Sequence, residues 1–110
     1  MTPVAVYAGN FASQPLAYAH VLDAAEAAEA AGLQLDLDHV EVICGGDPGK
    51  RLAHVFDTGN TARIRDMRRG EDTLVLIFPE ALRPGAAPFA DTARLRALGT
   101  FTPCGPRLRA

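Results

Sequence analysis

The fold prediction for this chain rests on Asn60–Pro84, NTARIRDMRRGEDTLVLIFPEALRP. The centre of this stretch, Thr73–Phe78 (TLVLIF), is an unbroken apolar and β-branched run, typical of a strand buried on both faces, as in a parallel sheet. An arginine-rich segment that ends at Gly70 precedes it and has the pattern of a short helix. Pro79 ends the strand, because proline cannot donate a hydrogen bond to a neighbouring strand. In open α/β sheets, ligands bind in the loops that follow such strands, so we expect a functional loop from Pro79 onwards.

Apolar patterns on either side of this stretch predict alternating strands and helices. Short crossovers between such elements favour a parallel sheet. The predicted fold class is α/β: a single-domain three-layer sandwich over residues 1–105, with a mostly parallel sheet of four or five strands and a basic C-terminal tail at 106–110. Further strands are expected at Pro3–Ala8, His39–Cys44 and Thr100–Cys104. Helices are expected at Pro15–Ala31, from a cap at Asp57, Thr58 or Asn60 to Arg69, and at Ala86–Leu98.

The first predicted helix has an apolar stripe. Leu16, Ala19 and Leu22 recur at helical spacing, so this side of the helix is expected to face the sheet. Asp23 and Glu26 are expected to face water.

The composition is that of an ordinary globular protein, with 110 residues, 48% hydrophobic and 22% charged. No run of about 18 apolar residues is present, so no transmembrane helix is predicted. The N-terminus has no signal-peptide pattern, and we expect a cytoplasmic protein without membrane contact. Cys44 and Cys104 lack the C-x-x-C spacing of metal and redox sites.

Charge is distributed unevenly along the chain. Residues 1–49 contain seven acidic residues and no Lys or Arg, whereas residues 50–110 contain all eleven basic residues and six acidic ones. A solvated face on each side of one sheet explains this asymmetry most simply. The alternative is electrostatic recognition, either of an acidic partner or of a second copy head to tail. The expected partner is a second copy in a homodimer or another protein. The acidic pI of about 5.8 argues against nucleic-acid binding. The predicted interaction surface consists of Arg65, Arg68 and Arg69.

Several loops have residues that are candidate ligand contacts. Thr58–Thr61 (TGNT) is similar to the phosphate loop of flavodoxins, although a capped helix start explains it more simply. Gly45–Lys50 is glycine-rich and basic but lacks the P-loop pattern. Glu80 and Arg83 follow the central strand and either position a phosphate or form a surface ion pair. A phosphate-containing small molecule is the ligand that this pattern favours. The candidate ligand contacts are Asn10, Ser13, Gly46, Thr58, Asn60, Glu80 and Arg83.

The sequence predicts no catalytic residue, metal site or cofactor. Ser13 is explained as a helix cap, and no G-x-S-x-G motif is present. His20, His39 and His54 lie in separate predicted elements without metal-ligand spacing. An enzymatic function is therefore the less favoured reading.

Five segments resemble the catalytic domain of serine recombinases, the resolvase and invertase family. Two of them are the alanine-rich helix that ends in A-A-G and the stretch RLRALGTFTPCG, which resembles a strand of that family. Val4–Gly9 (VAVYAG) resembles the opening strand of that family. Arg63–Ile77 (RIRDMRRGEDTLVLI) resembles its most specific piece, L-x-x-L-R-x-G-D-x-L-V-V. Pro79–Pro84 (PEALRP) lies where the family has L-D-R-L-x-R. The resemblance covers about residues 4–104 and implies a resolvase- or flavodoxin-like fold.

The positions that carry recombinase chemistry differ in this chain. The strand-end arginine of the family falls on Gly9, and its nucleophilic serine falls on Phe11. Strand cleavage needs that serine and arginines that stabilise the developing charge, so the resemblance implies a degenerate domain without recombinase activity. The predicted function is a non-catalytic protein-interaction or regulatory module. The alternative is a small-molecule, nucleotide or flavin-binding protein that uses the loops at the strand C-termini.

Overall fold

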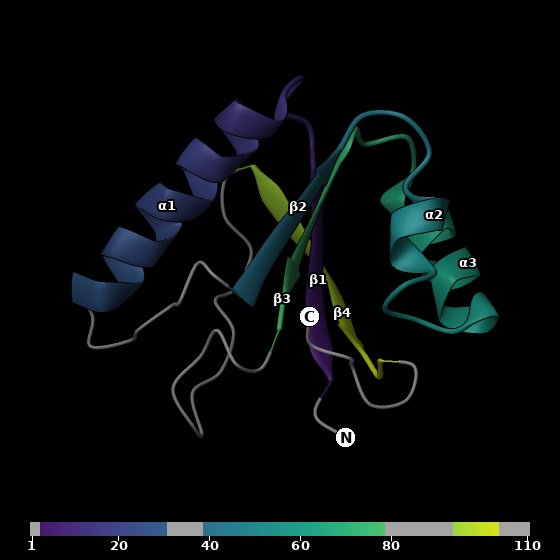
Figure 1. The fold of residues 1–110 in the computed structure, drawn as a ribbon. Coiled ribbons are helices and arrows are strands. Elements are labelled where there is room, and N and C mark those ends of the chain that lie inside the picture. The colour runs from purple at the N-terminus through teal and green to yellow at the C-terminus, as the bar shows by residue number, and fades with distance from the viewer. Residues whose placement is uncertain (1–2, 31–38, 79–93, 104–110) are drawn as a thin grey trace.

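The fold is a four-stranded sheet with helices on both faces (Figure 1). It was obtained as a computed structural model, which describes residues 3–30, 39–78 and 94–103. Helix α1 lies on one face of the sheet, and α2 and α3 lie on the other. In chain order the elements are β1 (Val4–Gly9), α1 (Gln14–Ala30), β2 (Val40–Cys44), α2 (Gly49–Leu52), α3 (Thr58–Arg68), β3 (Thr73–Ile77) and β4 (Leu95–Phe101).

The sheet is antiparallel, so the predicted mostly parallel sheet of a resolvase- or flavodoxin-like fold is wrong. Its strand order is β2-β3-β1-β4, and each neighbouring pair runs antiparallel. β1 and β2 point the same way, but β3 is inserted between them, which makes β1–α1–β2 a split βαβ unit. The apolar run at Thr73–Ile77 indicates burial on both faces and not strand direction, because helices cover both faces of this antiparallel sheet as well.

The central position of β3 agrees with the prediction from its sequence. All five of its residues are buried, and β2 and β1 flank it. Its side chains alternate between two apolar clusters. Leu74 and Leu76 belong to the cluster beneath α2 and α3, and Val75 and Ile77 belong to the cluster beneath α1.

Helix α1 packs on the sheet through a different side from the one predicted. Ala17 and Val21 are fully buried, whereas Leu16 and Leu22 are exposed. Ala17 and Val21 join the bulky side chains of Tyr7 and Phe11 in the cluster on this face of the sheet. The predicted stripe of Leu16, Ala19 and Leu22 is therefore wrong.

The helix expected at Ala86–Leu98 is contradicted over its last residues. Leu95–Leu98 belongs to β4, and residues 79–93 lie outside the described part of the chain. Gly99, expected to end the helix, lies inside the strand at φ 118°. The register of β4 against β1 shifts beside it, between Val6 and Tyr7, and glycine tolerates this backbone conformation because it has no Cβ atom. Pairing with β1 overrides the local helical pattern.

Helix α3 begins and ends close to the predicted residues. The Asp57 side chain accepts a hydrogen bond from Asn60 N at 2.8 Å, which identifies the N-cap. Arg69 and Gly70 both have positive φ and end the helix. In the described parts of the chain, no helix is long and apolar enough to cross a membrane.

Candidate functional site

The antiparallel sheet separates the predicted ligand contacts. The end of the sheet at which β1 and β2 finish is followed in the chain by three of these residues, Asn10, Ser13 and Gly46. Asn60 lies at the opposite end of the strands. Its Nδ2 donates a hydrogen bond to Thr102 O, just past the end of β4, at 3.3 Å. Thr58 is in the same first turn of α3. Glu80 and Arg83 lie outside the described residues, so the predicted single site is not assembled.

Asn10 takes part in a structural junction centred on Asp72, which the sequence did not identify. Asp72 N donates to Asn10 Oδ1 at 2.9 Å. The Asp72 carboxylate accepts from Phe11 N and Ala12 N, each at 2.9 Å, and from the Thr73 hydroxyl at 2.6 Å. The Thr73 hydrogen bond, followed by the one from Phe11 N, lowers the pKa of Asp72. These bonds fix the turn after β1, in which Ala12 has φ 67°.

Ser13 caps helix α1. Its Oγ accepts a hydrogen bond from Leu16 N at 3.4 Å, and its backbone oxygen accepts from Ala17 N at 3.2 Å. The hydroxyl is therefore used at the helix start, as the simpler explanation of this residue predicted.

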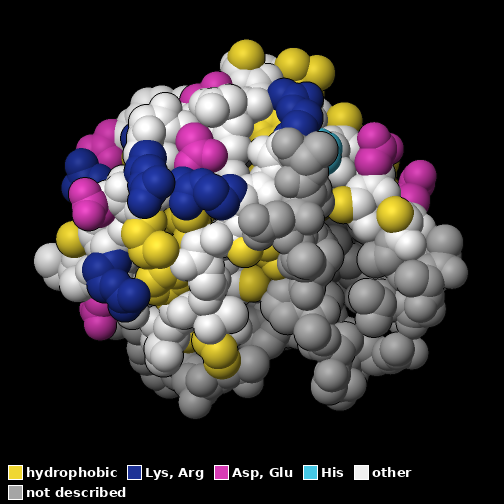
Figure 2. All heavy atoms as spheres, turned by 180° about the vertical axis from the view of Figure 1, so that it is seen from behind, with side chains coloured by type: hydrophobic (Ala, Val, Ile, Leu, Met, Phe, Trp, Pro, Cys, Tyr) yellow, Lys and Arg dark blue, Asp and Glu magenta, His cyan; other side chains and the backbone are white. Residues whose placement is uncertain are grey.

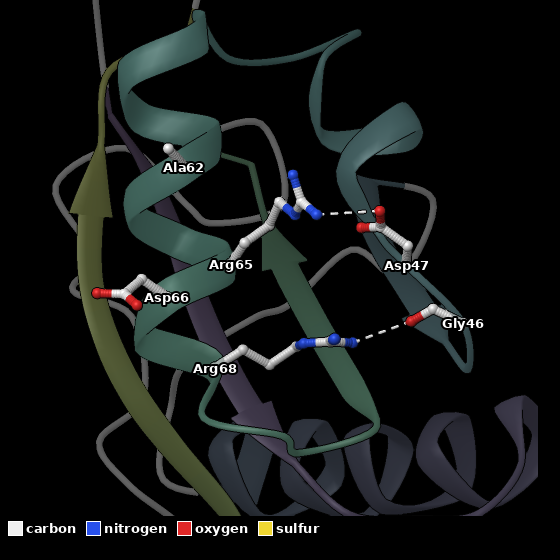
Figure 3. A pocket seen from close by; sticks show the side chains of 6 residues that line it. All are labelled: Gly46, Asp47, Ala62, Arg65, Asp66 and Arg68. Atoms are coloured by element: carbon white, nitrogen blue, oxygen red, sulfur yellow. Dashed lines mark hydrogen bonds and ion pairs between the residues drawn. The ribbon is translucent and has the colours of Figure 1, made fainter.

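The structure does bring Gly46 together with two of the three predicted interaction arginines. They line an open pocket of about 640 Å³ between α3 and the loop that follows β2. Figure 3 shows Arg65 and Arg68 reaching from α3 towards this loop, one helical turn apart. Arg65 Nη2 donates to Asp47 Oδ2 at 3.0 Å, and Arg68 Nη1 donates to Gly46 O at 3.2 Å. The pocket is lined by Gly46, Asp47, Ala62, Arg65, Asp66 and Arg68.

The two arginines of the pocket are weakly engaged. The Arg65 and Asp47 side chains are exposed by 50% and 65%, so their ion pair contributes at most about 1 kcal/mol. Arg68 contacts a neutral carbonyl, and its Nε is buried without a hydrogen-bond partner. Arg69, the third predicted residue, is exposed at the end of the helix. Figure 2 shows Lys and Arg side chains gathered on this side of the molecule, with Asp and Glu between them.

Two aspartates offset the two arginines, so the pocket lining has no net formal charge. Within the described ranges, no group of three or more His, Cys, Asp or Glu is placed to hold a metal ion. The pocket therefore presents two guanidinium groups, which can exchange their present partners for a carboxylate or a phosphate.

The second candidate surface is the outer side of α1. Its Tyr18 and Leu22 are exposed by 38% and 45%, one helical turn apart, and Glu26 continues the same row. Asp23 is exposed beside them. We call Tyr18, Leu22, Asp23 and Glu26 the outer surface of α1. The sequence analysis missed this surface because it assigned Leu22, together with Leu16 and Ala19, to the side that faces the sheet. Leu22 is also four residues from Tyr18, and this second pattern was not considered.

Comparison of the chain with protein-family models, with curated proteins and with solved structures gives no match.

Proposed function

We propose that this chain is a non-catalytic protein-interaction module and that it binds its partner through α1. The observation that carries the proposal is the inverted packing of this helix. Its small residues Ala17 and Val21 are buried against the sheet, while the larger Tyr18 and Leu22 keep 38% and 45% of their surface exposed. A helix that only covered a core would place its large apolar side chains on the buried side.

Burial of these side chains supplies the driving force for binding. Fully burying a leucine or an aromatic side chain contributes about 1.5–3 kcal/mol, and covering the exposed 38% of Tyr18 and 45% of Leu22 contributes somewhat less than half of this for each. Aromatic residues dominate many interfaces because they bury a large area and lose few rotamers. The adjacent Asp23 and Glu26 would then select a partner with basic groups next to an apolar patch.

The positions that correspond to recombinase catalysis also support a non-catalytic role. Phe11, at the position of the nucleophile, is 2% exposed and belongs to the core beneath α1. A Cβ atom at Gly9 would lie 2.3 Å from Arg94 O, in the residue just before β4, so an arginine at position 9 would clash with this backbone. If the chain is related to the recombinases, the relationship concerns its ancestry, because the residues at these two positions do not support recombinase activity.

Native mass spectrometry of the protein purified from its own host tests the function. We expect the wild-type chain to retain a polypeptide partner and Tyr18→Ser/Leu22→Ser to lose it. Ala27→Ser, also at an exposed position of α1, is the matched control and should keep the partner. A wild-type chain without any bound polypeptide, or a complex that survives the double substitution, would contradict the proposal.

A second candidate function is binding of a phosphate-containing small molecule, and the pocket between Arg65 and Arg68 favours it. Two guanidinium groups one turn apart can form charge-assisted hydrogen bonds to a phosphoryl group. Ligand at 100 times its Kd would stabilise the fold by about 2.7 kcal/mol. Thermal unfolding with inorganic phosphate and with nucleotides should then show a higher Tm for the wild type and no change for Arg65→Gln/Arg68→Gln. Equal Tm values with and without these ligands would exclude this candidate.

A further inference from the structure

We infer that the partner of α1 is a second copy of this chain and that the outer surface of α1 docks on the arginines of α3, Arg65, Arg68 and Arg69. This inference rests on the proposed function and identifies the occupant of its surface. Two helices of opposite charge carry it. Helix α1 contains Asp23, Glu26 and Glu29 and no basic residue, whereas α3 and its C-cap contain four arginines and one aspartate.

The two helices cannot neutralise each other within one molecule. They lie on opposite faces of the sheet (Figure 1). The acidic helix has no Lys or Arg among its own residues 14–30. A partner that covers Leu22 must therefore bring positive charge. On α3 of another copy, the two pocket arginines are offset by Asp47 and Asp66, and Arg69 adds the excess positive charge. Two α1 helices placed against each other would instead bring together acidic side chains without a cation, which disfavours a symmetric contact through this helix.

The spacing of the charges also matches. Asp23 and Glu26 are three residues apart, as are Arg65 and Arg68, so each pair spans about 4.5 Å along its helix axis. Both members of each pair lie within one turn and can meet the other pair together. Ala62 in the pocket wall leaves space beside the arginines, and this space can receive an apolar side chain such as Leu22.

The present contacts of the arginines do not oppose this exchange. The pair formed by Arg65 and Asp47 is half-exposed and weak. Arg69 is exposed beyond the helix end. An incoming carboxylate would replace these by charge-assisted hydrogen bonds in a surface from which the apolar side chains exclude water.

The two docking surfaces are different patches on one molecule, so the contact is head to tail. Each copy offers one α1 surface and one α3 surface, and the contact therefore continues into an open chain or closes into a ring. It should weaken with salt, because the Debye length falls from about 10 Å at 0.1 M to about 3 Å at 1 M ionic strength.

Two charge reversals on different molecules test the inference. The first variant is Asp23→Lys/Glu26→Lys, and the second is Arg65→Glu/Arg69→Glu, which leaves the bond from Arg68 to Gly46 in place. Molar mass is measured by light scattering after size-exclusion chromatography at 50 mM and 1 M salt. We expect the wild-type mass to rise with concentration beyond that of a dimer at low salt and to fall to the monomer at high salt.

Each variant alone should be a monomer, because each lacks one of the two surfaces. An equimolar mixture should assemble again, because the unchanged arginines of the first variant meet the unchanged acidic α1 of the second. The reversed surfaces, with Lys on α1 and Glu on α3, also attract each other. Circular dichroism and Tm values within about 3 °C of the wild type establish that both variants are folded. Lys50→Glu, an exposed charge reversal on α2, should assemble like the wild type.

Three outcomes would overturn the inference. The mixture could remain monomeric, the α3 variant alone could still dimerise through α1, or the wild type could be monomeric at low salt. The proposed function does not depend on these outcomes. It still holds if the protein purified from its host carries a different polypeptide and Tyr18→Ser/Leu22→Ser releases that polypeptide. The two proposals therefore fail separately.

Discussion

Helices α1 and α3 cover opposite faces of one sheet, but they are attached to it in different ways. Helix α3 has a side-chain N-cap from Asp57 and a fully buried anchor, Ile64. Arg68 and Arg96 tie its C-terminal half to the loop after β2 and to β4, through Gly46 O at 3.2 Å and Met67 O at 2.8 Å.

Helix α1 is attached mainly by apolar and ring contacts, among them the His20 ring at 5.3 Å from the ring of Phe11. Gln14 Nε2 donates to Val42 O at 3.3 Å, and Ala17 and Val21 supply the buried contacts. Its larger apolar side chains stay exposed. The difference indicates that α3 is fixed by a cap and by arginine hydrogen bonds, whereas α1 is fixed by small buried side chains and leaves larger apolar ones exposed.

The largest difference between the two helices is expected when the buried anchor residue of each is truncated to alanine. Ile64→Ala should lower the free energy of unfolding by about 2–5 kcal/mol, because it leaves a cavity in the core beneath α3. Val21→Ala removes fewer atoms and should cost about 1.5–2.5 kcal/mol, at about 0.8 kcal/mol per buried methylene plus a cavity term. Urea unfolding measures both. If Val21→Ala lowers the free energy of unfolding more than Ile64→Ala does, α1 and not α3 is the more firmly packed helix.

The caps give the next largest expected difference. Asp57→Ala should cost about 0.5–2 kcal/mol, because the N–H of Asn60 loses its acceptor. Ser13→Ala at the start of α1 should fall at the lower end of that range, since its hydrogen bond to Leu16 N is longer, at 3.4 Å. Thermal unfolding of the two variants side by side checks the order.

Asp72 ties the start of α1 to the strand after α3, and its effect depends on pH. Its pKa is lowered in the folded state, chiefly by the Thr73 hydroxyl. The stabilisation is therefore present above the unfolded pKa of about 3.9 and is lost as the pH falls through the folded value. Urea unfolding from pH 6 to pH 2.5 should show a steeper loss of stability for the wild type than for Asp72→Asn. Parallel curves would mean that the carboxylate contributes nothing at this junction.

The smallest expected effect on stability is that of Leu22→Ser. The side chain is 45% exposed, so its loss should change the free energy of unfolding by no more than about 0.5 kcal/mol. Urea unfolding under conditions where the protein is monomeric is the measurement. A loss above 1.5 kcal/mol would place Leu22 in the core and remove the basis for an exposed interaction surface.

Local signals in the sequence predicted where most elements lie. The first strand, the first helix, the strand before Gly45 and the central strand begin and end within one residue of the predicted bounds. Gly45, directly after β2, and Gly70, between α3 and β3, mark boundaries of this kind, as does the cap at Asp57. Such signals act between neighbours in the chain and can be identified without a structure.

The parts that failed depend on contacts between distant residues. Strand direction is set by pairing of β3 with β1 and β2, and an apolar run such as TLVLIF is compatible with either direction. The strand at Leu95 overrides a helical pattern in the same way. The junction of Asn10 with Asp72 joins residues 62 positions apart, and no spacing rule connects them. The antiparallel sheet in turn moved Asn60 away from Asn10 and divided the predicted ligand site.

The insertion of β3 between β1 and β2 has a consequence for how the chain folds during synthesis. When the first 60 residues have left the ribosome, β1, α1 and β2 are complete, yet neither strand has a neighbour to pair with. β1 pairs only with β3 and β4, and β2 pairs only with β3, among the described strands. Formation of the sheet must therefore wait until Ile77 emerges, and the nascent N-terminal half is exposed to chaperones and proteases until then.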